Sequence, residues 1–163
     1  MRPDPGFPYN PKSTARLRSG MFWPIVLTDG AFAAGVVLGV PRAGDPHLPT
    51  SSRIFVAGLL DWFSGESPTP EDLGSAQLVT WGAAHVKSID VTSAGAGVTG
   101  ATLAELNGVE MVSHRGGGDV AVYVNGMFDR SATARDIQTL PGFGTWGLGF
   151  VQALAERYRD GAT

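Results

Sequence analysis

The chain has 163 residues, of which 43% are hydrophobic and 17% charged, and its net charge at pH 7 is −3. This length and composition fit one globular domain with a sizeable core, and they exclude an intrinsically disordered chain. Cysteine is absent, which excludes disulfides and thiolate metal sites, and a reducing, cytoplasmic location is the simplest expectation.

Charge is distributed unevenly along the chain. Residues 1–18 carry four basic side chains and one acidic one, whereas residues 19–163 carry eight basic and fourteen acidic, a net charge of −6. An acidic body does not predict a nucleic-acid partner, because nucleic-acid binding needs a basic surface. Four prolines and the lack of periodicity predict that residues 1–18 form a flexible basic arm. Residues 19–163 are then a single α+β domain.

No membrane segment is expected. The longest apolar run, Gly30–Pro41, has 12 residues, whereas a helix that crosses a bilayer needs about 20. The proline-broken start, MRPDPGFPYNP, lacks the apolar core of a secretory signal.

The segment Met21–Val40 predicts a β-hairpin. Two apolar runs flank Asp29-Gly30, and Asp-Gly between such runs is typical of a type I′ turn, in which both central residues have positive φ. An antiparallel sheet is therefore expected at the start of the domain.

Strands dominate the next part of the chain. Pro41–Ser52 is a loop by composition, and Arg53–Phe63 predicts a buried third strand. Pro70 after Thr69, with an acidic residue three positions beyond Thr69, predicts a short capped turn of helix. Ala76–Val91 contains one or two further strands, QLVTW and HVKSIDV.

The second half predicts another hairpin and three helices. The hairpin strands, Val109–His114 and Asp119–Asn125, flank a glycine-rich run at 115–118. The predicted helices are Thr99–Asn107, Ser131–Leu140 and Leu148–Arg159. Together the elements predict an α+β fold, with a mainly antiparallel curved sheet or small barrel, short helices and a C-terminal helix packed against the sheet.

The pattern S-x-T-x-x-D-[LI] occurs twice, at residues 67–73 and 131–137, and each copy precedes a Trp-Gly pair. We interpret both copies as helix-capping boxes, which reuse the same few residue types. An internal duplication is the alternative.

One glycine motif carries an alternative function. Gly95, Gly97 and Gly100 match G-x-G-x-x-G between an expected strand and an expected helix, the context of a dinucleotide-binding turn. Three residues separate that strand from the first glycine, and the helix is short for a crossover. With 23 glycines in the chain, chance matches are expected. A small nucleotide-binding protein or enzyme is therefore an alternative, and no cofactor is expected.

Hydrolytic and metal motifs are absent from the sequence. It contains neither G-x-S-x-G nor H-E-x-x-H, and its three histidines, His47, His85 and His114, are widely spaced. Neither catalytic residues nor a metal site are expected.

The four tryptophans divide into two pairs. Trp23 and Trp81 lie inside apolar strands, so burial is expected. Trp62, with Phe63 beside it, and Trp146 lie next to loops, where aromatic side chains either close the core or anchor a protein partner. With Arg115 in the glycine-rich loop, these residues are the candidates for partner binding.

Several of these segments resemble one known family. SGMFWPIVLTDGAFAAGVVLG, RIFVAGLLDWF, SPTPEDL and AQLVTWGAAHVKSI, then VAVYVNG, SATARDIQTL and FGTWGLGFVQALAERY, are similar to the immunity protein 26 family of bacterial toxin–immunity systems. The similarity covers about residues 18–159, in hydrophobic and turn positions, and brings no catalytic residue with it. The proline-rich arm and the glycine-rich segments depart from the family pattern.

The resemblance implies a non-enzymatic, cytoplasmic protein-binding module that neutralises a cognate bacterial toxin. The acidic body would then steer it toward a basic partner. A structural module that self-associates through exposed aromatic side chains is a further alternative.

Overall fold

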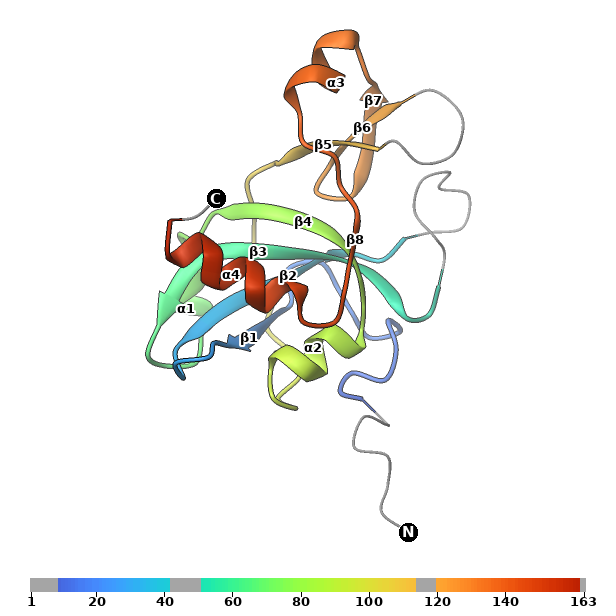
Figure 1. Ribbon diagram of the computed structural model, residues 1–163. Helices are drawn as coiled ribbons and strands as arrows, with labels where there is room; N and C mark the ends of the chain where they lie inside the picture. The colour runs from blue at the N-terminus through green and yellow to red at the C-terminus, as the bar shows by residue number, and fades with distance from the viewer. Residues whose placement is uncertain (1–8, 42–50, 114–119, 162–163) are drawn as a thin grey trace.

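Two β-sheets and four helices make up the computed structural model, which describes residues 9–41, 51–113 and 120–161 (Figure 1). The strands of the main sheet follow the order β1-β2-β3-β4-β8, and those of the small sheet the order β5-β6-β7. The main-sheet strands are β1 (Phe22–Val26), β2 (Phe32–Gly39), β3 (Ile54–Ser64), β4 (Leu78–His85) and β8 (Thr145–Trp146). The small-sheet strands are β5 (Glu110–Ser113), β6 (Ala121–Val124) and β7 (Met127–Ser131). The helices are α1 (Pro70–Leu73), α2 (Lys87–Thr92), α3 (Ala134–Thr139) and α4 (Phe150–Arg159).

The predicted α+β class is confirmed, with a mostly antiparallel sheet, short helices and a C-terminal helix. Neighbouring strands from β1 to β4 are antiparallel, and only β8 joins its neighbour β4 in parallel. The sheet does not close into a barrel, because β1 and β8 form its two edges.

The main sheet is buried on both faces. Successive side chains of a strand point to opposite faces, so each apolar strand supplies two cores. On one face α2 and α4 cover a cluster that includes Trp23, Phe55 and Trp146 (Figure 1). On the other face a second cluster joins Phe22 and Trp81 of the main sheet to α1 and to the small sheet.

The predicted first hairpin is confirmed, but its turn is of a different type. Gly30 donates its N–H to the carbonyl of Leu27, and Leu27 donates to Ala31. Within this turn only Gly30 has positive φ, at 84°. Thr28-Asp29-Gly30 is therefore a three-residue loop, in which a type I turn ends in a left-handed glycine.

A different turn, at Asn125-Gly126, is of type I′. These residues have φ values of 51° and 83° and join β6 to β7, with Val124 paired to Met127. Asn-Gly is a preferred I′ dipeptide, so the sequence held a signal for β7 that our prediction missed. The expected helix over Ser131–Leu140 correspondingly begins at Ala134, after β7 has ended.

Two local predictions were wrong. HVKSIDV is not a strand, because β4 ends at His85 and α2 follows. Buried positions at Ser88, Ile89 and Thr92 have helical spacing, and the Thr92 hydroxyl accepts the Trp23 indole N–H at 3.0 Å. Residues 99–107 form no helix; instead residues 99–103 run beside the start of β1, where Leu103 donates to the carbonyl of Gly20.

Both copies of the repeated pattern are capping boxes, as interpreted from the sequence. Thr69 caps α1 and Thr133 caps α3, each with an aspartate three residues on that bonds back to the cap.

Residues 9–18, part of the segment expected to be a flexible arm, contact the domain. Thr14 donates its N–H to Ser52 at 2.7 Å, Leu17 is buried in the first core, and Tyr9 packs edge-on against His85. Residues 1–8 lie outside the described part of the chain.

A first prediction concerns close packing at Gly35. A Cβ at this position of β2 would lie 2.3 Å from the Trp23 ring, whereas a Cβ at Gly39 of the same strand would meet no atom within 4 Å. Gly35→Ala should lower the free energy of unfolding by about 1–3 kcal/mol, because the buried indole has little room to move. Gly39→Ala should change it by less than about 1 kcal/mol. Urea unfolding followed by tryptophan fluorescence measures both, and equal midpoints would contradict this packing.

A second prediction concerns the attachment of α4 to the first hairpin. Glu156 accepts hydrogen bonds from the main-chain N–H and the hydroxyl of Thr28, both at 2.7 Å, and Arg159 pairs with Asp29 at 3.0 Å. The Thr28 donors, the main-chain N–H first, hold the pKa of Glu156 below its ordinary value of 4.5.

A carboxylate whose pKa is lowered by folding stabilises the fold above its unfolded pKa, and this contribution is lost as the pH falls through the folded pKa. Glu156→Gln should therefore make the free energy of unfolding fall less steeply with acidification below pH 4.5. Thr28→Val removes only the hydroxyl donor and should give an intermediate slope. Denaturant titrations at a series of pH values check this, and a slope unchanged in Glu156→Gln would refute it.

Candidate functional site

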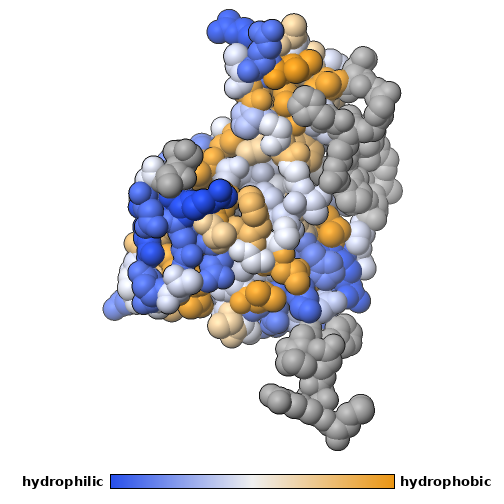
Figure 2. Space-filling view, in the orientation of Figure 1, coloured by the Kyte–Doolittle hydropathy of each residue, from blue (hydrophilic) through white to orange (hydrophobic). Residues whose placement is uncertain are grey.

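Three large apolar side chains are exposed on the small sheet and α3. Met127 is 73% exposed, Phe128 59% and Ile137 42%. Figure 2 shows hydrophobic residues over the part of the molecule where these elements lie. Phe128 packs edge-on against the buried ring of Tyr123, with ring centroids 6.0 Å apart, which leaves its other side open to solvent. Large exposed apolar side chains in one region are typical of a binding surface.

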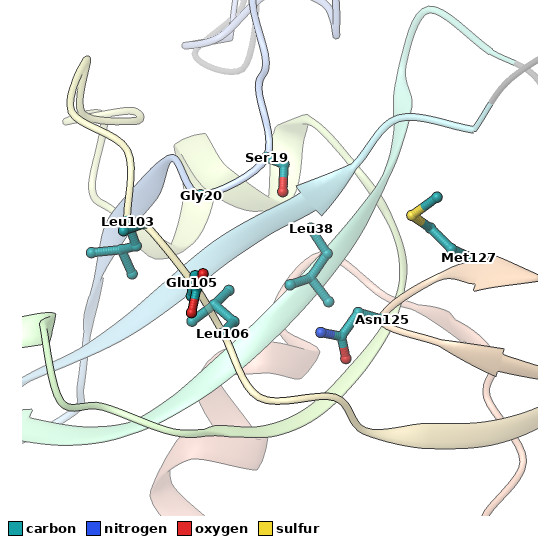
Figure 3. A pocket seen from close by; sticks show the side chains of 9 residues that line it. Ser19, Gly20, Leu38, Leu103, Glu105, Leu106, Asn125 and Met127 are labelled. Atoms are coloured by element: carbon teal, nitrogen blue, oxygen red, sulfur yellow. The ribbon is translucent and has the colours of Figure 1, made fainter. Parts of the chain in front are cut away.

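A groove adjoins this surface, where β7 begins (Figure 3). Its volume is about 200 Å³, and polar and apolar atoms line it in equal measure; we call it the apolar groove after its leucine and methionine walls. Leu38 of β2, Leu103 and Leu106 of the segment 99–107, and Met127 of β7 supply its apolar walls. Its remaining lining residues are Ser19, Gly20, Ala104, Glu105 and Asn125.

Two glycines allow the walls of the groove to approach the main sheet. A Cβ at Gly20 would lie 2.6 Å from the Leu103 carbonyl oxygen, and one at Gly126 would lie 2.5 Å from the Val56 side chain. Both glycines have positive φ. Glycine is therefore required at both positions.

Two asparagine side chains hold the segment before β5 and the β6–β7 turn in place beside the groove. Asn107 accepts a hydrogen bond from the Leu78 N–H and donates to the Leu78 carbonyl at 3.1 Å, so it binds β4 as a neighbouring strand would. Asn125 accepts from Val109 and donates to the Asn107 carbonyl, both at 2.9 Å. The amide of Asn125 is thus engaged in holding the hairpin in place.

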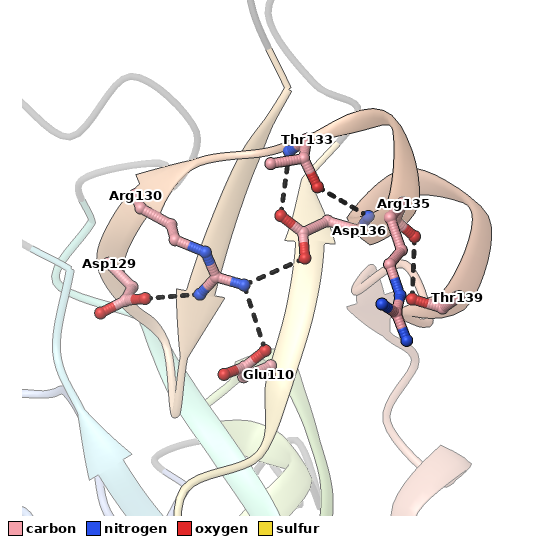
Figure 4. A network of polar contacts seen from close by, with 7 residues as sticks. All are labelled: Glu110, Asp129, Arg130, Thr133, Arg135, Asp136 and Thr139. Carbon is pink, nitrogen blue, oxygen red and sulfur yellow. Dashed lines mark hydrogen bonds and ion pairs between the residues drawn. The ribbon is translucent and has the colours of Figure 1, made fainter.

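A network of ion pairs around Arg130 joins β5, β7 and α3 (Figure 4). The guanidinium lies 2.7 Å from Asp129, 3.0 Å from Asp136 and 3.4 Å from Glu110. The Thr133 N–H is the largest cause of a lowered pKa of Asp136, with smaller contributions from the Thr133 hydroxyl and Arg130, against an opposing effect of desolvation. Three carboxylates around one guanidinium leave this network negatively charged.

The sequence-predicted partner residues do not form one surface. Trp146 is only 9% exposed and lies over Gly82, beside Phe150 of α4. Phe63 is half-buried and stacks on Tyr158 near the other end of α4.

Trp62 packs on the opposite face of the main sheet, among the residues of the second core, where it is half-buried. Arg115 lies outside the described residues. Trp23 and Trp81 are buried, as expected. Met127, Phe128 and the leucines of the groove were not predicted, since nothing in the order of residues along the chain indicates that the groove forms or that Phe128 is exposed.

The glycine turn at Gly95–Gly100 lacks the context that a dinucleotide site requires. It follows the helix α2 instead of a strand, and no helix follows it. Asn10 fills the turn, because its amide donates to the Gly95 carbonyl at 3.1 Å and a Cβ at Gly97 would lie 2.5 Å from the same side chain. Gly100 is exposed, with open space beside it.

His85 is engaged locally. Its Nδ1 accepts the Lys87 N–H at 3.0 Å, and burial first, then the charges of Arg53 and Lys87, lower its pKa. His47 and His114 lie outside the described residues. Among the residues that the structure describes, no three acidic or histidine side chains are grouped as metal ligands. None of the described helices has the length and apolar character to cross a bilayer.

No family model matches the chain, and no curated protein or solved structure is significantly similar to it.

A third prediction tests the Arg130 network. α3 has no buried residue, so its position depends on its capping box and on the ion pair between Arg130 and Asp136. Arg130→Ala should speed hydrogen exchange of the α3 amides and leave the main-sheet amides unchanged, because the network lies at the surface. Arg135→Ala removes a guanidinium from α3 that bridges no carboxylate among the described residues. Equal exchange of α3 in both variants would contradict the role of Arg130.

Proposed function

We propose that this chain is a non-enzymatic protein-binding module of the immunity type, which neutralises a cognate bacterial toxin by binding it. The observation that carries the proposal is the exposure of three large apolar side chains on the small sheet and α3, Met127, Phe128 and Ile137, of which Met127 also lines the apolar groove. The resemblance of the sequence to immunity proteins supplies the class of partner.

The chemistry of this surface favours a protein partner over a small molecule. Methionine and aromatic side chains are enriched at protein interfaces, where a few such anchors contribute most of the binding energy. At about 200 Å³ the groove is smaller than the ~300–1,000 Å³ typical of pockets for drug-sized ligands.

Charge favours a basic partner. Carboxylates outnumber guanidinium groups in the Arg130 network, and Glu105 adds another carboxylate at the groove. The net charge of −3 over the full chain would speed the encounter with a basic toxin. Bound there, the chain would block access to the toxin by steric cover, with no chemical step of its own.

Neither alternative has comparable support. Asn10 occupies the turn that a nucleotide would need. Self-association through the exposed surface would place the carboxylates of the Arg130 network near those of a second copy, which is unfavourable.

A fourth prediction follows for the protein encoded beside this one. The purified chain should bind that product in isothermal titration calorimetry and restore growth to cells that express it. Because encounter is electrostatically steered, the association rate should fall as salt rises from 0.05 to 0.5 M, roughly by tenfold or more. Absence of both binding and rescue would reject the proposal. Rescue without binding would reject neutralisation by occlusion.

A further inference from the structure

The strand β7 forms the outer edge of the small sheet. It is bonded to β6 on one side, and no backbone group in residues 9–41, 51–113 or 120–161 bonds to its other side. The opposite edge of the sheet is covered, because Val112 of β5 donates to Pro141 and accepts from Phe143. The edge of β7 therefore presents free N–H and C=O groups that can pair with a further strand.

The apolar groove lies at the start of this edge. Met127 is both the first residue of β7 and a wall of the groove (Figure 3). A strand that pairs with β7 and extends past Met127 would therefore reach the groove. Its side chains alternate between faces, so one apolar side chain can enter between Leu38 and Leu103. A volume of about 200 Å³ suits one or two aliphatic side chains.

The charges around the edge identify the kind of strand that fits. Glu105 lines the groove, and Asp129, Glu110 and Asp136 lie around Arg130. With Arg135 on α3, this region holds four carboxylates and two guanidinium groups. Arg18 directly precedes Ser19 of the groove and lines a neighbouring pocket with Met21, and with it counted the carboxylates still outnumber the guanidinium groups by one. A basic strand is therefore favoured, and a second copy of this chain is disfavoured.

We propose that β7 and the apolar groove together bind an extended, basic segment of a protein partner by strand addition, with one apolar side chain of that segment in the groove. This inference rests on the proposed protein-binding function and identifies the surface and the chemistry of the segment.

A fifth prediction uses two short blocked peptides as probes: one alternates lysine with leucine, the other glutamate with leucine. In amide NMR spectra of the full chain, the lysine peptide should shift the signals of residues 127–131 and 103–106 and slow hydrogen exchange along β7. It should bind roughly tenfold more tightly than the glutamate peptide at low salt, and this ratio should shrink at 0.5 M salt.

Two matched variants distinguish binding of the peptide in the groove from attraction of the peptide by the overall charge of the chain. Met127→Ser removes an apolar wall without changing charge and should weaken the lysine peptide about fivefold or more. Val91→Ser removes an exposed apolar side chain from α2 and should leave its affinity unchanged.

Three results would overturn the inference: equal affinity for both peptides, shifts confined to residues outside β7 and the groove, or dimerisation of the chain through β7. The same variants separate this inference from the proposed function. If the neighbouring gene product binds Met127→Ser as tightly as the unmodified chain, strand addition is rejected and the protein-binding function stands. If that product does not bind at all, both are rejected.

Discussion

The arrangement of the candidate site depends on Trp81. This side chain, 1% exposed on β4, donates its indole N–H to the Val109 carbonyl at 2.8 Å and packs on Phe143 at a centroid distance of 4.7 Å. Phe143 in turn packs against Tyr123 of β6 at 5.4 Å. The Trp81 indole therefore contacts both the segment that leads into β5, at Val109, and the segment that follows α3, at Phe143. Because Met127 of the small sheet and Asn125 of its turn line the apolar groove, these contacts help to hold the groove in shape.

Burial on both faces explains the composition of the main sheet. A sheet buried on both faces needs apolar residues at nearly every position, so its strands read as continuous apolar runs. Large indoles fit between the layers because glycines face them, Gly35 under Trp23 and Gly82 under Trp146. Covering layers lie close to the sheet at these points, and the packing excludes the open space that a ligand site within the core would require.

Local signals in the sequence were sufficient for much of the fold. The hairpin at Met21–Val40 and the caps at Thr69 and Thr133 depend on neighbouring residues, and the structure contains all three. The helix α2 was missed because β-branched residues favour a strand locally, whereas burial around Trp23 selects the helix. The groove was missed for a different reason. Its walls come from four separate segments, and their contact arises only from tertiary structure.

The fold does not by itself require the apolar side chains at the start of β7. An edge strand in solvent is usually protected by charged side chains, and Asp129 and Arg130 serve that role in the middle of β7. Met127 and Phe128 lie at the groove end of the same strand and remain largely exposed. The turn that precedes them needs only Asn125 and Gly126 to form, so folding alone would accept polar residues in their place. Their exposed apolar side chains at the groove end of β7 are therefore what the proposed binding of a partner strand accounts for and folding does not.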